Sequence, residues 1–110
     1  MDSRLLSGTV DMLILEVISH SPTYGYEIVQ MVAERSRGYF ELKEGSLYPA
    51  LHRMERQKLL ASSWREADSH RRKYYRLTPS GHRALEAKKQ AWSAFATGVR
   101  GVLVDAGGVV

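Results

Sequence analysis

The chain is 110 residues long, the size of one domain, and its 44% hydrophobic and 25% charged residues are ordinary for a globular protein. It has no cysteine, so disulfides, thiol nucleophiles and cysteine zinc sites are excluded. No apolar run approaches the roughly 18 residues that a transmembrane helix needs, and the N-terminus lacks the pattern of a secretory signal, so we expect a cytoplasmic protein with no membrane partner.

Positive charge is concentrated in the middle of the chain. Between Arg35 and Arg76 there are eleven basic and five acidic residues, whereas the rest of the chain has five basic and seven acidic residues. The formal net charge is +4. We therefore expect an anionic partner to meet the central part of the chain.

The N-terminal third predicts two helices. The first covers about residues 5–18, because its apolar residues recur at helical spacing: Leu6, Val10, Leu13, Ile14, Val17 and Ile18. Pro22 ends this helix. Thr23 offers an N-cap for a second helix to about Ser36, and Gly38 is placed to end it.

A third helix is expected from about Gly45 or Ser46 to Gln57, after a short alternating segment, residues 39–42, that suggests an edge strand. Pro49 is tolerated if it lies in the first turn, which indicates a start near Ser46. The inward face of this helix holds Leu47, Leu51 and Met54. Its outward face is polar and cationic and holds Pro49, His52, Arg53 and Arg56.

A change to period-two alternation predicts a β-hairpin from Ala61–Glu66 and Arg72–Leu77, joined by a loop over residues 67–71. The residues expected to face inward are Trp64, Tyr75 and Leu77. Thr78 and Pro79 then form a strong helix start.

The last helix is expected to run some 25 residues, to about Leu103. Its apolar residues follow a 7-3-4-3 spacing like the seam of a coiled coil: Leu85, Trp92, Phe95, Val99 and Val102. A small domain cannot cover such a seam, which therefore predicts a two-fold dimer interface. Two Trp92 rings facing across the axis either pack directly, which we favour, or hold a planar aromatic ligand between them.

The order of these elements is that of a winged helix-turn-helix fold, a mainly α structure with a small β-hairpin. The first two helices bury the inner face of the third and present its outer face to a DNA groove. The sequence thus predicts a DNA-binding domain over residues 1–78, a C-terminal dimerisation helix over 79–104 and a flexible tail over 105–110.

Basic side chains in this arrangement suggest two kinds of DNA contact. Arg53 and Arg56 can fork onto guanine O6 and N7, and His52 and Gln57 can also reach base edges. Ser46, near the helix N-terminus, can contact a phosphate. The hairpin loop suits phosphate binding through His70, Arg71, Arg72 and Lys73.

Four stretches of the sequence resemble the PadR family of bacterial transcriptional regulators: Leu6–Val10, Tyr24–Ile28, Glu44–Leu51 and Tyr74–Gly81. The chain departs from the family at Gln57–Lys58, where many members have a glycine that ends the helix. The resemblance implies a homodimeric repressor of a near-palindromic operator, with dimerisation through the C-terminal helix. It also implies that Ser46, Tyr48 and the residues after them approach the operator.

The complete set of expected DNA contacts adds residues at the helix starts to those above: Tyr24, Tyr26, Lys43, Ser46, Tyr48 and Pro49. The expected dimer or ligand interface is Leu6, Leu85, Trp92, Phe95, Val99 and Val102. Some small members of the family bind flat aromatic drugs between subunits, so the resemblance also suggests a small planar effector.

The sequence also bears on two other function classes. Enzymatic chemistry is disfavoured because the four histidines lack metal-ligand spacing, and phosphate-binding loops and nucleophile motifs are missing from the sequence. We therefore expect no catalytic residue, metal or cofactor. A winged-helix module that binds a protein and does not read DNA is the alternative, but such a module has no need for many basic residues on one side.

Overall fold

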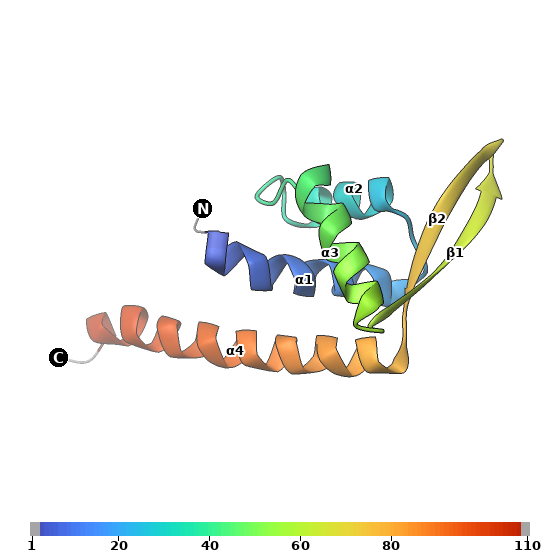
Figure 1. Cartoon of the computed structure of the whole chain (residues 1–110). Helices are drawn as coiled ribbons and strands as arrows, with labels where there is room; N and C mark the ends of the chain where they lie inside the picture. Colours follow the sequence, from blue (N-terminus) through green and yellow to red (C-terminus); the bar gives the residue numbers. More distant parts are fainter. Residues whose placement is uncertain (1–2, 109–110) are drawn as a thin grey trace.

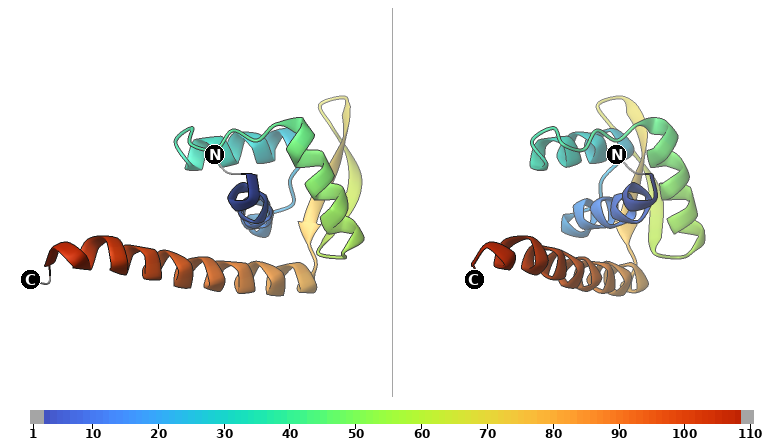
Figure 2. Two further views of the ribbon diagram at one scale, coloured as in Figure 1. Left: turned by 60° about the vertical axis from the view of Figure 1, so that its left-hand side comes forward. Right: turned by 90° about the vertical axis from the view of Figure 1, so that its left-hand side faces the viewer.

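The structure, a computed structural model, describes the backbone of residues 3–108 and the side chains of residues 8–104. It confirms a mainly helical chain with one hairpin, in the order α1 (Ser3–His20), α2 (Gly25–Arg35), α3 (Glu44–Arg56), β1 (Leu60–Ala67), β2 (His70–Leu77) and α4 (Pro79–Gly108). The first three helices and the base of the hairpin form the body of the molecule. The C-terminal part of α4 extends beyond α1 as a rod (Figure 1; Figure 2).

The core lies where α1, α2 and α3 meet the base of the hairpin. Its fully buried side chains come from each of these elements and include Ile14, Leu15, Ile18, Ile28, Leu47, Leu51, Met54 and Tyr75. The predicted inward face of α3 is thereby confirmed. Burying one such side chain stabilises the fold by about 1.5–3 kcal/mol, so these residues hold α3 with its other face outward.

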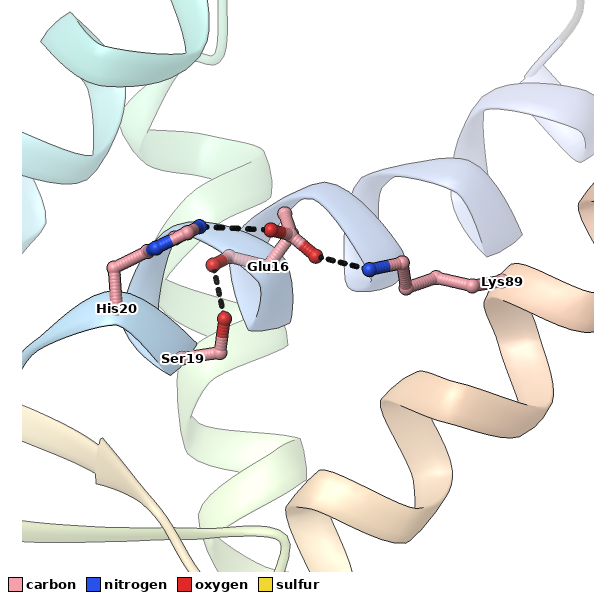
Figure 3. Close-up of polar contacts among 4 residues, drawn as sticks. All are labelled: Glu16, Ser19, His20 and Lys89. Atoms are coloured by element: carbon pink, nitrogen blue, oxygen red, sulfur yellow. Dashed lines mark hydrogen bonds and ion pairs between the residues drawn. The ribbon is translucent and has the colours of Figure 1, made fainter.

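The first half of α4 is fastened to α1 (Figure 3). Glu16 of α1 accepts hydrogen bonds from Lys89 at 3.0 Å and from His20 at 2.8 Å, and Ser19 donates to the Glu16 carbonyl. Leu85 is only 5% exposed and belongs to the core of its own chain. The expectation that Leu85 contributes to a dimer seam is therefore wrong, because α4 still lies against the body at this point.

Thr23 does not cap α2 as predicted. It is buried and pairs with β2, donating its N–H to the Tyr75 carbonyl at 3.1 Å and accepting from the Tyr75 N–H at 2.8 Å. Its hydroxyl donates to Glu27. The N-cap position is Tyr24, whose side chain makes no capping bond. Thr23 therefore pairs with β2, although its residue type also favours the N-cap position of a helix.

The turn after α2 is closed by Gly38, which has a φ of 80° and donates its N–H to the Ala33 carbonyl at 2.7 Å.

Residues 39–42 do not form the predicted strand. No neighbouring strand pairs with them within the described chain, and the Phe40 N–H is satisfied by the Ser36 hydroxyl at 3.0 Å. The strand predicted from the apolar–polar alternation of residues 39–42 is therefore wrong.

Helix α3 begins at Glu44, earlier than predicted, so Pro49 is its sixth residue and lies in the second turn. The expectation that Pro49 belongs to the first turn is wrong. A proline at this position has no N–H to donate to the Gly45 carbonyl. Because Gly45 is exposed, water can satisfy that carbonyl, and the helix continues.

Helix α3 ends without a glycine, at the point where the sequence departs from the family that it resembles. Lys58 takes the left-handed conformation instead, with a φ of 63°. The Leu59 N–H then donates to the Met54 carbonyl at 2.9 Å and satisfies one of the last carbonyls of the helix.

The hairpin is longer and tighter than predicted. Its antiparallel register runs from Leu60 opposite Leu77 to Ala67 opposite His70, so only Asp68 and Ser69 form the turn. Both have φ above 50°, as a two-residue turn of this twist requires. The predicted five-residue loop is therefore wrong.

The predicted inward residues of the hairpin are confirmed at its base and not farther out. Tyr75 and Leu77 are buried, whereas Trp64 is 56% exposed. Trp64 lies opposite Lys73, in the outer half of a hairpin that projects away from α4 (Figure 1). The helices do not cover this outer half, so an apolar residue there stays in contact with solvent.

Helix α4 starts as predicted, because the Thr78 hydroxyl accepts a hydrogen bond from the Gly81 N–H at 3.0 Å. It continues to Gly108, so residues 105–108, expected in a tail, have helical backbone, and residues 109–110 lie outside the described part. A search of the described helices finds none long and apolar enough to span a membrane.

Candidate nucleic-acid interface

Helix α3 presents a polar face to solvent. Its exposed residues are Ser46, Tyr48, Pro49, His52 and Arg56. Tyr48 is 39% exposed, and its ring leans over the start of α2, where a Cβ added at Gly25 would lie 2.6 Å from the Tyr48 hydroxyl oxygen. Glycine at position 25 thus leaves room for a tyrosine that borders both α2 and the open face of α3.

An open groove of about 510 Å³ lies between the start of α2, the outer face of α3 and the hairpin, which we call the wing. Its lining brings together most of the side chains that the sequence suggested for DNA: Tyr24, Tyr26, Tyr48, His52, Arg71, Arg72 and Lys73. The lining contains three cationic side chains and no carboxylate. The groove is therefore suited to an anionic ligand.

Two wing arginines of the groove are stacked on aromatic rings. The guanidinium carbon of Arg72 lies 4.4 Å from the centre of the Tyr24 ring, and that of Arg71 lies 4.7 Å from the centre of the Trp64 ring. A guanidinium over the face of an aromatic ring is attracted to the ring, and its N–H groups can still donate to an acceptor. The exposed Trp64 thus serves as a platform for Arg71.

A third stacked arginine, Arg65, was missed by the sequence reasoning. It lies opposite Arg72 in the hairpin register, and its guanidinium carbon is 4.7 Å from the centre of the Tyr74 ring. The Tyr74 ring makes an edge contact with Tyr24 at 5.3 Å between centroids. The sequence did contain a signal for Arg65, because the alternation of side chains along β1 puts it on the face of the hairpin that carries Arg72 and Tyr74.

Lys73 does not lie in the hairpin loop, where the sequence placed it. It belongs to the middle of β2, and its ammonium group donates to Glu55 of α3 at 3.2 Å. Glu55 also accepts from the Ser62 hydroxyl. The hydrogen bond from Ser62, followed by that from Lys73, lowers the pKa of Glu55 against the opposing effect of burial. Glu55 therefore joins α3 to both strands of the wing.

Arg53 is not free on the outer face of α3 as predicted. Its two terminal nitrogens donate to the two carboxylate oxygens of Asp11 in α1, at 2.7 and 2.8 Å. Asp11 is 8% exposed. The hydrogen bond from Arg53 to Asp11 raises the pKa of Arg53. A buried carboxylate needs a cationic partner, and Arg53 provides it.

Tyr26, one of the groove residues, is exposed, and its hydroxyl accepts a hydrogen bond from Gln30 at 3.1 Å. Other expected contact residues do not line the groove, among them His70, which is exposed beside the hairpin turn. Lys43 and Ser46 border a second hollow, of about 530 Å³, together with the loop that precedes α3. These two residues lie toward the other end of the α3 outer face.

The C-terminal part of α4 has an apolar stripe that the described residues leave uncovered. Its exposed side chains are Trp92, Phe95, Val99 and Val102, joined by Leu103, which was not predicted. The Trp92 and Phe95 rings stack with centroids 5.9 Å apart and border a hollow of about 410 Å³ between α1 and α4. The side chain of Leu6 lies outside the described residues.

Groups of three or more potential metal-ligating side chains are not found among the described residues. A three-helix body with a hairpin beside an outward-facing third helix defines the winged-helix class of DNA-binding proteins. The basic groove lies between that helix and the wing.

Comparison with known proteins gives the family. The sequence pattern of the Transcriptional regulator PadR-like family matches residues 14–87, and the chain belongs to this family. The chain is 34% identical to the transcriptional regulator Rv3488 of Mycobacterium tuberculosis over 79% of its length and 81% of that protein. DNA-binding regulation of transcription is thereby supported, and no enzymatic family is indicated.

Solved structures agree with this assignment. A transcriptional regulator from Clostridium thermocellum superposes with a TM-score of 0.82 at 30% identity, covering 88% of this chain and 95% of the other. A PadR family transcription regulator from Clostridium difficile superposes with a TM-score of 0.72 at 40% identity, covering 86% and 97% of the two chains. The winged-helix fold with a long C-terminal helix is therefore shared with these proteins.

Proposed function

We propose that this protein is a homodimeric repressor that binds a near-palindromic operator in the cytoplasm and is not an enzyme. The observation that carries the proposal is the basic, aromatic-lined groove between the exposed face of α3 and the wing. In this arrangement α3 enters the major groove of DNA, and the wing lies along the adjacent backbone.

Contacts to bases come from the exposed face of α3. Arg56 is exposed and has no ion-pair partner among the described residues, so its guanidinium is available for guanine O6 and N7. His52 and Tyr48 lie on the same face, with ring centroids 6.5 Å apart. Ser46, Pro49 and Lys43 complete the side of α3 that faces the DNA.

Contacts to phosphates come from the wing and the start of α2. Arg71 and Arg72 offer N–H groups while their guanidinium carbons lie over the Trp64 and Tyr24 rings. Tyr24, Tyr26 and His70 add hydroxyl and imidazole groups around them. Contacts of this kind contribute affinity and position the protein without distinguishing sequences.

Dimerisation follows from the apolar stripe on α4. A second copy of the chain covers Trp92, Phe95, Val99 and Val102 through a two-fold interface, since soluble proteins rarely leave such a stripe in water. Two recognition helices then face half-sites about 34–36 Å apart, one turn of DNA, which makes the operator near-palindromic.

Across the two-fold axis, the two Trp92 rings are expected to pack directly on one another. The alternative is that they hold a small planar aromatic effector between them. Trp92 and Phe95 also border a hollow of about 410 Å³ between α1 and α4 of one chain. Titration with planar dyes, followed by tryptophan fluorescence, separates the two: quenching that disappears in Trp92→Ala supports a ligand, and quenching that survives it does not.

DNA binding is tested by selection from a random duplex library with the full-length protein, followed by mobility shifts at two salt concentrations. We expect recovery of a two-fold symmetric sequence and a steep fall in affinity with salt. Retention of no sequence above background would instead favour the alternative function, a winged-helix module that binds a protein partner.

A further inference from the structure

Helix α3 is held by two polar clamps near its C-terminal end, and they connect it to different parts of the molecule. Glu55 connects it to the wing through Ser62 and Lys73. Arg53 connects it to α1 through Asp11. The two clamps leave the outer face of the helix, with His52 and Arg56, exposed.

The Asp11–Arg53 contact has the geometry of a rigid clamp. Two parallel hydrogen bonds, 2.7 and 2.8 Å long, fix both the distance and the plane of the guanidinium against the carboxylate. Asp11 is buried, so the loss of Arg53 would leave a carboxylate with no partner inside the protein. Both terminal nitrogens of Arg53 are used, which takes away the fork that guanine recognition requires.

Helix α1 is also the element against which α4 rests. Glu16, five residues after Asp11, accepts from Lys89 of α4 at 3.0 Å (Figure 3). The segment of α4 just beyond Lys89 begins the apolar stripe at Trp92. Helix α1 therefore lies between the helix that is proposed to pair with a second subunit and the helix that is proposed to enter the DNA.

We propose that Asp11 and Arg53 are positioning residues that set the angle of α3 against the α1–α4 unit, and thereby the spacing of half-sites that a dimer accepts. Arg53 acts through Asp11 and does not contact bases. This inference rests on the proposed function, because half-site spacing has meaning only for a dimer that binds DNA.

The two roles of Arg53 predict opposite results when Asp11 is neutralised. If Arg53 contacted bases, Asp11→Asn would release it and would maintain or raise operator affinity. If Arg53 is a positioning residue, Asp11→Asn loosens α3, lowers affinity for the selected operator about tenfold or more, and broadens the range of accepted half-site spacings.

The experiment uses the full-length protein and a set of operators in which the distance between half-sites is changed by one and two base pairs in each direction. Wild type, Asp11→Asn and Arg53→Lys are titrated against each operator and against random DNA. Glu34→Gln is the matched control, because it removes one negative charge from an exposed acidic residue that has no ion-pair partner among the described residues.

We expect both pair variants to show a flattened dependence on spacing, to select the same bases within each half-site as wild type, and to bind random DNA like the control. Arg53→Lys keeps the charge and loses the fork, so it reports on geometry even where Asp11→Asn unfolds at the assay temperature. Thermal melts accompany every titration.

Two results would overturn the inference. An unchanged spacing profile in folded Arg53→Lys removes the positioning role. A changed base preference at one position of each half-site assigns Arg53 to direct base contact instead. A wild-type protein that retains no DNA sequence would overturn the proposed function itself. A wild type that binds its operator, with variants that bind it equally well, would overturn only the positioning role.

Discussion

The arginines near the proposed DNA interface differ in what holds their side chains. Arg71 and Arg72 rest on rings, Arg53 is bound to a buried carboxylate, and Arg56 is exposed without an ion-pair partner among the described residues. Residues of one type thus have three different environments, and their substitution should have different consequences for DNA binding.

Arg72→Ala should weaken binding to operator and to random DNA alike. Its guanidinium lies over Tyr24 in the wing groove, where we propose that it contacts the DNA backbone and not the bases. Loss of one phosphate contact should lower the slope of log affinity against log salt by about 0.9. Arg100→Ala, in the far part of α4, is the control, and a loss confined to the operator would contradict a phosphate role.

Glu55→Gln should give a stability loss that depends on pH. The hydrogen bond from Ser62, and then that from Lys73, lower the pKa of Glu55 below its ordinary value of 4.5, so the ionised carboxylate stabilises the folded state above pH 4.5. This contribution disappears as the pH falls below 4.5 through the folded pKa. We expect the variant to be about 1 kcal/mol less stable at neutral pH.

Urea denaturation of both proteins across the acid range measures this difference. Glu66→Gln is a suitable control, because Glu66 is exposed in the outer part of the wing. A difference between wild type and Glu55→Gln that stayed constant down to pH 3 would show that the charge of Glu55 has no part in joining α3 to the wing.

At the scale of elements, the junction between wing and α4 determines how the hairpin is held. Thr78 donates its hydroxyl proton to the Lys58 carbonyl at 2.7 Å and accepts from the Gly81 N–H, so one side chain joins the end of α3 to the start of α4. Gly81 lies directly against the Leu59 carbonyl. The base of the wing is thus enclosed between two helices.

Gly81→Ala should destabilise the protein by about 1–3 kcal/mol, although alanine favours a helix. A Cβ at position 81 would overlap the Leu59 carbonyl oxygen, which is backbone and cannot turn aside. Gly45→Ala, at a helical position with open space around it, should be neutral or stabilising by up to about 1 kcal/mol. Thermal melts that rank the two variants the other way would contradict the tight junction.

At the scale of the whole molecule, α4 is longer than the body that it supports. The molecule extends 64 Å along its longest axis and only 28 and 23 Å along the others. The rod that continues past α1 contributes to this length (Figure 2) and carries the C-terminal part of the uncovered apolar stripe, whereas Trp92 and Phe95 lie beside α1. A second chain of the same kind offers a matching stripe of equal length.

The protein should sediment as a dimer at micromolar concentration, and Phe95→Glu/Val99→Glu should sediment as a monomer with greatly weakened operator affinity. Thr97→Glu is the matched control, since position 97 is exposed and lies on the opposite side of the helix. Circular dichroism checks that each variant keeps its helices. A wild-type protein that stays monomeric would remove the basis for a two-fold operator.

Local sequence patterns were sufficient for much of the fold. The apolar spacing of α1 and α3, the alternation in the hairpin and the Thr78–Pro79 start predicted the order of elements. Most of the side chains that line the groove are among those expected to contact DNA. These signals depend on periodicity and capping, which act within a few residues of the chain. The predicted inward residues Leu47, Leu51 and Met54 are accordingly buried.

Tertiary structure decided the features that depend on residues far apart in the chain. Thr23 pairs with β2 instead of capping α2, and Leu85 lies in the core instead of at a dimer interface. Lys73 donates to Glu55, and Arg53 donates to Asp11, which lies 42 positions earlier in the chain. Local sequence patterns cannot identify such partners, because the contacts depend on which side chains become buried and which charges come together when the elements pack. The sequence thus determined which helix faces outward, and only the packed structure determined which of its arginines is available to DNA.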